Sequence, residues 1–298
     1  MADPQGLIVA AHGRHYLAQS QGQLFECVTR GKKSDVATGD RVRFKQTSPN
    51  QGVIEEILPR ATLLYRSDQY KSKLLAANVT QLFIVVATEP GFSDDLVSRS
   101  LVAANAAGIK AHLILNKIDL TELRDVAHTR LQTYTSLGYP LHEVSAKEDP
   151  QATLQALQGL LEGESTILIG QSGMGKSSLV NLLVPDADIA VREISQRLDT
   201  GKHTTTFTRL YPLNETTSVI DSPGFQEFGL YQLSEGLLER AFPEFEAYLG
   251  LCRFYNCHHL NEPGCAVLQG VSDGNISPAR HALYVQLRHE SLQTIGYR

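Results

Sequence analysis

One glycine-rich segment of the sequence has the spacing needed to bind a phosphate. Residues 170–177 read GQSGMGKS and fit the pattern GxxxxGK[ST] between a predicted strand and a predicted helix. In such a loop the glycines let backbone N–H groups turn toward phosphates, while Lys176 reaches the β and γ oxygens and Ser177 coordinates Mg²⁺. The predicted phosphate-loop residues are Gly170, Gln171, Ser172, Gly173, Met174, Gly175, Lys176, Ser177 and Ser178.

A second motif, NKID at residues 116–119, suits the recognition of one nucleobase. A carboxylate at Asp119 can accept hydrogen bonds from both N1–H and the 2-amino group of guanine, whereas adenine has an acceptor at N1 and no 2-amino group. The tripeptide SAK at 145–147 follows the next predicted strand, where a backbone amide could meet the guanine O6. Asn and Asp are also common in ordinary turns, so NKID alone leaves that interpretation open. The predicted guanine-site residues are Asn116, Lys117, Asp119, Ser145, Ala146 and Lys147.

The third motif, DSPG at residues 221–224, closes a predicted strand. Asp221 would hold Mg²⁺ through water, and the Gly224 N–H would meet the γ-phosphate. A threonine run at 204–206 lies where a switch residue should close over the metal, and we expect Thr205 to be that residue, although such a run is also good strand sequence. The predicted magnesium ligands, direct or through water, are Ser177, Thr205 and Asp221.

Phe225 follows DSPG at the position where many GTPases carry the glutamine that orients the attacking water. Phenylalanine cannot do this, so intrinsic turnover should be slow. His203, in the segment GKHTTT, is the candidate catalytic replacement, because a neutral imidazole can accept a hydrogen bond from water. The alternative is that His203 is an ordinary exposed histidine.

Three cysteines and a histidine lie close together near the C-terminus. Cys252, Cys257, His259 and Cys265 form the pattern CxxxxCxHxxxxxC, which suits a tetrahedral structural zinc ion with no open ligand position. The residues alone do not choose between His259 and the adjacent His258. Reduced cysteines packed in a small core are the other interpretation.

These motifs must be positioned by two kinds of secondary structure. The first 60 residues contain five short β-prone runs separated by turn signals, which predicts a small OB-like barrel. The runs are at residues 7–11, 15–19, 24–29, 41–44 and 52–57. From about residue 79, predicted strands at 82–87, 112–116, 142–146, 166–170 and 218–221 alternate with helices. That alternation predicts a parallel sheet covered by helices.

The order of the motifs is unusual, because NKID and SAK precede the phosphate loop instead of following DSPG. This order indicates a circularly permuted GTPase domain, in which the same strands pack although the chain begins elsewhere. The spacing becomes helical again after residue 230. We therefore predict an OB-fold RNA-binding domain at 1–62, a permuted α/β P-loop GTPase domain at 63–229 and a helical zinc-binding domain at 230–298.

Composition restricts the class of protein. The 298 residues are 42% hydrophobic and 20% charged, which is ordinary for a globular chain. The longest compact apolar run, 82–87, is far short of the roughly 20 residues that cross a bilayer. The start lacks a basic segment followed by an apolar one, so we expect a soluble cytoplasmic protein without a membrane partner. Four cysteines are too few for a disulfide scaffold, and Cys27 stands alone in an apolar run as a small hydrophobe.

The charge is unevenly distributed. The net charge is −5, yet residues 1–73 hold 11 Lys and Arg against 7 Asp and Glu. A basic N-terminal segment on an acidic body is compatible with a local contact to a polyanion such as RNA, although a solvated surface would look the same.

The chain resembles the RsgA (YjeQ) family of ribosome small-subunit-dependent GTPases over nearly its whole length. NKID, SAK, GQSGMGKSS, GKHTTT, DSPGF and CRFYNCHHLNEPGCAV stand in that family's order and spacing. The resemblance implies GTP hydrolysis coupled to late maturation of the small ribosomal subunit, with the subunit and its rRNA as partners. It also implies Cys252, Cys257, His259 and Cys265 as the zinc ligands. We expect a monomer that binds GTP and GDP with magnesium.

Two other classes compete with this interpretation. In the first, the chain is an RNA-binding switch in which GTP only sets the residence time on the RNA. In the second it is a P-loop ATPase or a small-molecule kinase, which NKID disfavours, as does DSPG in place of a second substrate site.

Overall fold

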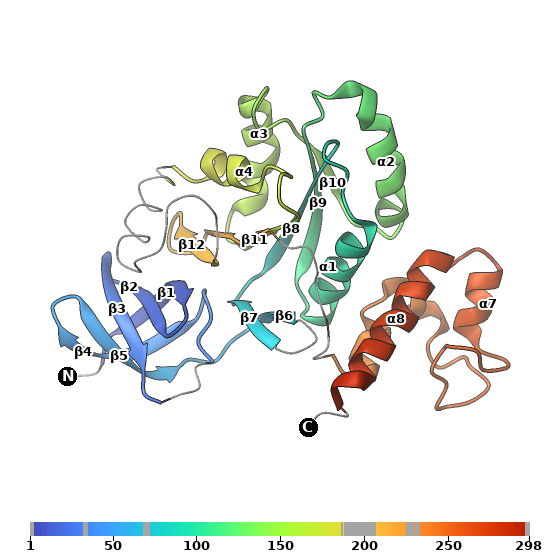
Figure 1. The fold of residues 1–298 in the computed structure, drawn as a ribbon, viewed down its shortest axis with the longest axis horizontal. Helices are drawn as coiled ribbons and strands as arrows, with labels where there is room; N and C mark the ends of the chain where they lie inside the picture. Colours follow the sequence, from blue (N-terminus) through green and yellow to red (C-terminus); the bar gives the residue numbers. More distant parts are fainter. Residues whose placement is uncertain are drawn as a thin grey trace.

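The computed structural model describes residues 3–31, 35–67, 72–185, 187, 207–224, 230 and 233–295. Figure 1 shows a barrel formed by the first strands, a central sheet flanked by helices, and a helical module at the C-terminal end. The three predicted kinds of architecture are therefore confirmed.

Five short strands form the barrel, as the turn signals predict. They are β1 (Gln5–His12), β2 (His15–Ser20), β3 (Gln23–Thr29), β4 (Arg41–Ser48) and β5 (Gln51–Ile57). The strand order is β1-β2-β3-β5-β4, and β4 pairs back to β1, which closes the barrel. Its interior is apolar, with Phe25 and Phe44 5.0 Å apart between ring centroids and Ile8 and Val42 fully buried. This is the five-stranded closure expected of an OB-type barrel.

A hairpin that the sequence analysis did not predict follows the barrel. Strands β6 (Leu63–Ser67) and β7 (Ser72–Ala77) pair with each other in a separate two-stranded sheet. Its base is fixed to the barrel, because the Ala77 N–H donates to the Thr38 carbonyl at 2.8 Å. The hairpin thus connects the barrel to the central sheet.

The central sheet has the predicted parallel strands. They are β8 (Gln81–Ala87), β9 (Lys110–Asn116), β10 (Leu141–Glu143), β11 (Ser165–Ile169) and β13 (Ser218–Asp221), with β12 (Arg209–Pro212) antiparallel at the end. The order is β10-β9-β8-β11-β13-β12. Every residue of β8 is buried, as expected for a strand covered on both faces.

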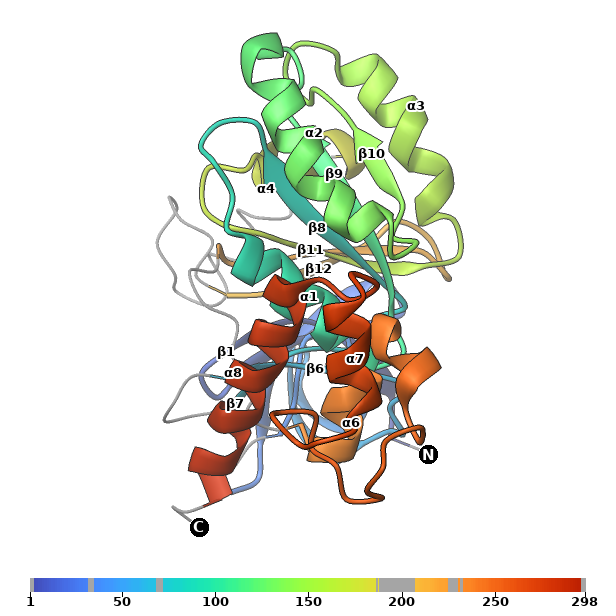
Figure 2. The same ribbon diagram turned by 90° about the vertical axis from the view of Figure 1, so that its right-hand side faces the viewer.

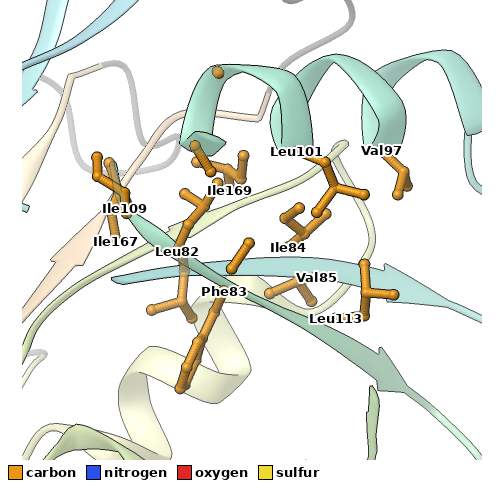
Figure 3. Packing of buried hydrophobic residues seen from close by; sticks show 14 of the residues in the cluster. Leu82, Phe83, Ile84, Val85, Val97, Leu101, Ile109, Leu113, Ile167 and Ile169 are labelled. Carbon is orange, nitrogen blue, oxygen red and sulfur yellow. The ribbon is translucent and has the colours of Figure 1, made fainter. Parts of the chain in front are cut away.

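In the part of the chain that the structure describes, four helices cover this sheet. They are α1 (Asp94–Ala106), α2 (Thr121–Thr135), α3 (Pro150–Leu161) and α4 (Lys176–Leu183). In Figure 3, Val97 and Leu101 of α1 pack over Ile84, while Phe83 lies on the opposite face of the sheet. Alternate side chains of β8 therefore pack against the helices on opposite faces of the sheet.

The barrel and the central sheet are joined by direct strand pairing. Strand β1 pairs antiparallel with β12 at Ala10 and Arg209, so the two units share one eleven-stranded sheet. The Thr38 hydroxyl also donates to the Thr208 carbonyl at 3.2 Å in a buried position.

The C-terminal module contains α6 (Glu235–Arg240), a 3-10 helix η1 (Pro243–Tyr248), α7 (Ala266–Ser272) and α8 (Pro278–Ile295). Phe242, Phe245 and Tyr284 form its aromatic core. The module packs on α1, as Figure 2 shows, and Arg99 of α1 donates to both carboxylate oxygens of Glu290 on α8 at 2.7 and 2.8 Å.

Candidate functional site

All four nucleotide motifs meet at one edge of the central sheet. NKID and DSPG begin at the last residues of β9 and β13, SAK follows β10 and the phosphate loop follows β11. Ligands bind at the carboxyl ends of parallel strands in open α/β sheets, which is the edge where these motifs lie. They surround a cavity of about 700 Å³.

Most of the predicted nucleotide-site residues line this cavity. The predicted members are Asn116, Lys117, Asp119, Ser145, Ala146, Lys147, Ser172, Gly173, Gly175, Lys176, Ser177, Ser178, Asp221 and Gly224. Gly170, Gln171 and Met174 belong to the same loop but are not among the residues that line the cavity. The Gln171 side chain accepts a hydrogen bond from the Ser93 N–H at the start of α1, at 2.8 Å.

Lys176 crosses the phosphate loop at its base. Its Nζ donates to the carbonyls of Gly170 and Gln171 at 2.8 and 2.9 Å, and only 7% of the residue is exposed. Burial lowers the pKa of Lys176, and the negative charge of Asp221 acts in the opposite direction. The ammonium group is therefore held in the loop, where its positive charge can attract a phosphate group.

Asn116 connects three of the motifs. Its Nδ2 donates to the Met174 carbonyl at 3.0 Å, and its Oδ1 accepts from the Ala146 N–H at 3.1 Å. Gly175 has a φ of +92°, and a Cβ there would lie 2.1 Å from the Asn116 Nδ2. The motif spacing did not indicate this connection.

Asp119 is oriented by its neighbours. The Ser145 hydroxyl donates to Oδ1 of Asp119, so the SAK segment contributes a side chain as well as backbone to this end of the cavity. Lys117 has a φ of +64°, and its Nζ donates to the Glu89 carbonyl at 2.7 Å. Together these contacts fix the loop that presents the Asp119 carboxylate.

The DSPG segment touches the phosphate loop. The Ser222 hydroxyl donates to the Leu168 carbonyl at 2.6 Å, and a Cβ on Gly224 would lie 3.1 Å from the Ser172 nitrogen. Asp221 is 5% exposed and lines the cavity together with Ser177. A carboxylate and a hydroxyl are oxygen donors of the type that Mg²⁺ prefers.

Three residues that the sequence analysis singled out, His203, Thr205 and Phe225, lie outside the described residues. Conversely, six cavity residues were not predicted: Glu148, Val180, Asn181, Arg209, Tyr211 and Ser222. Ser222 stands within DSPG, and Arg209 and Tyr211 alternate along a short strand. That alternation was their only signal, and a four-residue strand is too short for it to be distinctive.

The cysteine and histidine side chains of the C-terminal module converge. One ligand atom from each of Cys252, Cys257, His259 and Cys265 lies within 4.8 Å of the other three. The His259 Nδ1 lies 3.5 Å from Cys252 Sγ and 3.4 Å from Cys265 Sγ, and the two sulfurs are 3.9 Å apart. A tetrahedral ion with Zn–S of about 2.3 Å and Zn–N of about 2.0 Å would place sulfur and nitrogen roughly 3.5 Å apart. The donor set and its spacing therefore fit such a metal.

The geometry also distinguishes the two adjacent histidines. His259 is 4% exposed, and its Nε2 lies 3.5 Å from a Glu239 carboxylate oxygen, the outer partner that a metal-bound imidazole commonly has. His258 instead lies 3.7 Å from a Glu235 carboxylate oxygen. His259 is thus the member of the metal cluster, as the family pattern implies.

Backbone groups support the sulfurs. The Ala266 N–H donates to Cys252 Sγ at 3.3 Å, and the Leu268 N–H donates to Cys265 Sγ at 3.5 Å. Burial raises the pKa of Cys257 to about 12, and a bound cation would favour the thiolate. The four residues are suited to a structural metal ion with all ligand positions filled.

The fold and the converging motifs define a P-loop GTPase whose chain order is circularly permuted. The family model for the RsgA GTPase matches residues 57–231. The chain belongs to the RsgA GTPase family. No helix within the described ranges is long and apolar enough to cross a membrane.

Known proteins resemble the chain along almost its full length. It is 60% identical to a small ribosomal subunit biogenesis GTPase RsgA from Burkholderia pseudomallei strain K96243, over 98% of this chain and 93% of the relative. It is 59% identical to the protein of the same name from Paraburkholderia xenovorans, over 97% and 94% of the two chains. Among solved structures, YjeQ from Thermotoga maritima gives a TM-score of 0.71 at 29% identity, covering 97% of this chain and 98% of that one. YloQ, a circularly permuted GTPase, gives 0.68 at 27% identity, over 98% and 96%.

Proposed function

We propose that this chain hydrolyses GTP to GDP and phosphate during late maturation of the small ribosomal subunit, to which it binds. One observation carries the nucleotide part: NKID, SAK, the phosphate loop and DSPG, spread over residues 116–224, surround a single cavity. The names of the relatives, which are small ribosomal subunit biogenesis GTPases, support the cellular role.

The residues at the two ends of the cavity would bind different parts of the nucleotide. Asp119, oriented by Ser145, reads the guanine edge, and Lys176 with the loop N–H groups holds the β- and γ-phosphates. Ser177, Asp221 and Thr205 would hold the magnesium ion, directly or through water. When bound, that ion neutralises charge that develops on the phosphate oxygens.

His203 is proposed to orient the attacking water, because Phe225 replaces the glutamine that other GTPases use. The small subunit would order the segment that carries His203, as activating partners do for other P-loop GTPases, with a contribution of about 10³ to 10⁵ in rate. We therefore expect slow turnover alone and strong stimulation by purified small subunits. His203→Ala should lose the stimulated rate and keep GTP binding. Full stimulation of this variant would exclude the catalytic role.

The remaining assignments complete this proposal. Residues 1–62 would contact rRNA through the basic barrel, residues 63–229 would form the GTPase domain, and residues 230–298 would be stabilised by one structural zinc ion. We propose a cytoplasmic monomer. Elemental analysis under reducing, chelator-free conditions should find one zinc per chain, and its absence would contradict the metal assignment.

Guanine recognition is tested most directly at Asp119. The change Asp119→Asn replaces one acceptor with a donor and should weaken GTP binding by roughly 2 to 4 kcal/mol while favouring xanthosine triphosphate. Titration of both nucleotides with wild type and variant measures the exchange of preference. A variant that bound GTP as tightly as wild type would overturn the guanine-site assignment, and tighter binding of ATP by wild type would favour the ATPase class.

A further inference from the structure

Strand β12 adds a guanidinium to the nucleotide cavity, which Lys117, Lys147 and Lys176 also line. Arg209 and Tyr211 both line the cavity, as alternate residues on one face of the strand. Arg209 is directly opposite Asp221 in the antiparallel pair of β12 and β13. Opposed residues of such a pair point to the same face, so Arg209 lies at the Asp221 end of the cavity rather than at the Asp119 end.

The barrel contacts the three residues that end in Arg209. The Phe207 ring lies 5.5 Å from the His12 ring of β1, between centroids, and the Thr208 carbonyl accepts from the Thr38 hydroxyl at 3.2 Å. The third residue, Arg209, is the register partner of Ala10. Each of these contacts crosses between the barrel and the central sheet.

Phe207 also supports the side chain of Arg209. The guanidinium carbon stands 4.4 Å from the centroid of the Phe207 ring, a cation–π arrangement, and Arg209 is 5% exposed. The contacts therefore run from His12 of the barrel to Phe207, and from Phe207 to a guanidinium in the wall of the cavity. A guanidinium is a planar hydrogen-bond donor whose geometry matches phosphate oxygens. Its charge-assisted hydrogen bonds to phosphate are stronger where water is excluded.

We propose that Arg209 binds the terminal phosphate of GTP as a second cation beside Lys176, and that the N-terminal barrel positions it through Phe207. This inference rests on the proposed GTP site. The physical basis is the register: Asp221 begins the segment that reaches the phosphate loop, and Arg209 stands opposite Asp221. The barrel thereby contributes to the nucleotide site without lining it.

The charge of Arg209 can be tested separately from its bulk. Arg209→Met keeps most of the aliphatic stem and removes the charge, whereas Arg209→Lys keeps the charge. For the methionine variant we expect about tenfold weaker binding of a non-hydrolysable GTP analogue and less than about twofold change for GDP. The lysine variant should retain most of the preference for the triphosphate. Arg124→Met, which removes a guanidinium paired with Glu143 on the same domain, should change neither affinity.

The role of the barrel needs a second variant. His12→Ala leaves every cavity residue in place and removes the ring that packs on Phe207, so it should weaken the GTP analogue about two- to threefold and leave GDP unchanged. His15→Ala, at an exposed histidine on the neighbouring strand β2, is the matched control. Equal effects of His12→Ala and His15→Ala would overturn the positioning by the barrel.

The outcomes distinguish a failure of the role of Arg209 from a failure of the proposed GTPase function. A wild-type protein that binds neither GTP nor GDP would contradict the proposed function itself. If wild type binds both nucleotides and Arg209→Met keeps the preference for the triphosphate, the GTPase assignment stands and the role of Arg209 is wrong. Equal losses for GTP analogue and GDP would show that Arg209 only supports the fold.

Discussion

The phosphate loop at residues 170–177 is shaped by its main chain, whereas the metal cluster at residues 252–265 is shaped by four side chains. In the loop, glycines at 170, 173 and 175 adopt positive φ, and Lys176 bonds to two carbonyls of the loop itself. In the cluster, three sulfurs and one imidazole converge from a short segment. The phosphate loop needs positive φ angles, which residues with a side chain rarely adopt. The metal cluster needs particular ligand atoms.

The two regions also differ in what surrounds them. The phosphate loop depends on distant residues, because Asn116 donates to the Met174 carbonyl and the Ser93 N–H donates to the Gln171 side chain. The sulfurs of the metal cluster are supported from residues close by in the chain, through the N–H groups of Ala266 and Leu268 that follow the last ligand. Substitutions in the cluster should therefore alter only the structure around it, whereas substitutions in the loop should also alter the neighbouring motifs.

The largest effect is expected from the loss of a metal ligand. Cys257→Ala should abolish stoichiometric metal binding and melt the C-terminal module, at a cost of at least about 3 kcal/mol, because a structural zinc ion contributes folding free energy directly. Nucleotide affinity should change less than about threefold. Cys27→Ala, at a buried cysteine of the barrel, is the control and should retain the metal. Metal content, thermal unfolding and GTP titration measure the three effects, and a large loss of GTP affinity in Cys257→Ala would contradict the local character of the cluster.

A smaller effect is expected from a single methyl group in the phosphate loop. Gly175→Ala places a Cβ 2.1 Å from the Asn116 Nδ2 at a φ of +92°, so we expect about 100-fold weaker GTP binding. Gly173→Ala has a similar φ of +84°, but its Cβ would stand 3.4 Å from Pro90, an ordinary contact. About tenfold weaker binding is expected for that control. If both variants lost the same affinity, the close approach of Gly175 to Asn116 would not determine GTP binding.

The smallest effect involves neither region and provides a reference for both. The His112 Nδ1 lies 3.1 Å from the His142 Nε2, and burial lowers the pKa of both imidazoles. Because the unfolded chain then binds protons more readily, this pair should reduce the free energy of unfolding as the pH falls below about 6.5. Between pH 7.5 and 5.5, the decrease in the free energy of unfolding should be about 0.5 kcal/mol smaller in His142→Gln than in wild type. Urea unfolding at the two pH values measures it, and an unchanged pH dependence in the variant would argue against the pair.

The two regions were predictable from the sequence to different degrees. The phosphate loop and NKID were found because their chemistry demands particular residues at fixed spacing. The choice of His259 over His258 needed the family pattern or the fold, because the two histidines are adjacent in the sequence. The role of Asn116 as a connection between loops could not be derived, since it depends on which strands lie side by side.

Secondary structure was predictable where the hydrophobic pattern was long. The five barrel strands and the five parallel strands overlap the predicted runs. The β6–β7 hairpin was missed because the polar run between its strands carries no Gly or Pro turn signal. Strand β12 was missed because no nucleotide motif follows its four residues, whereas DSPG marks the end of the equally short β13, and the placement of Arg209 in the cavity was missed with it.

The pairing of β1 with β12 has a consequence for the order of events during synthesis. The barrel strands leave the ribosome first, yet the partner of Ala10 is Arg209, about 200 residues later in the chain. At a synthesis rate of about 5 to 20 residues per second, the edge of β1 near Ala10 waits roughly 10 to 40 s for that partner. The closed barrel can form early, because all five of its strands lie within the first 57 residues. The joint with the central sheet can form only when β12 has emerged, so the joined sheet is a late product of translation, well after the barrel itself.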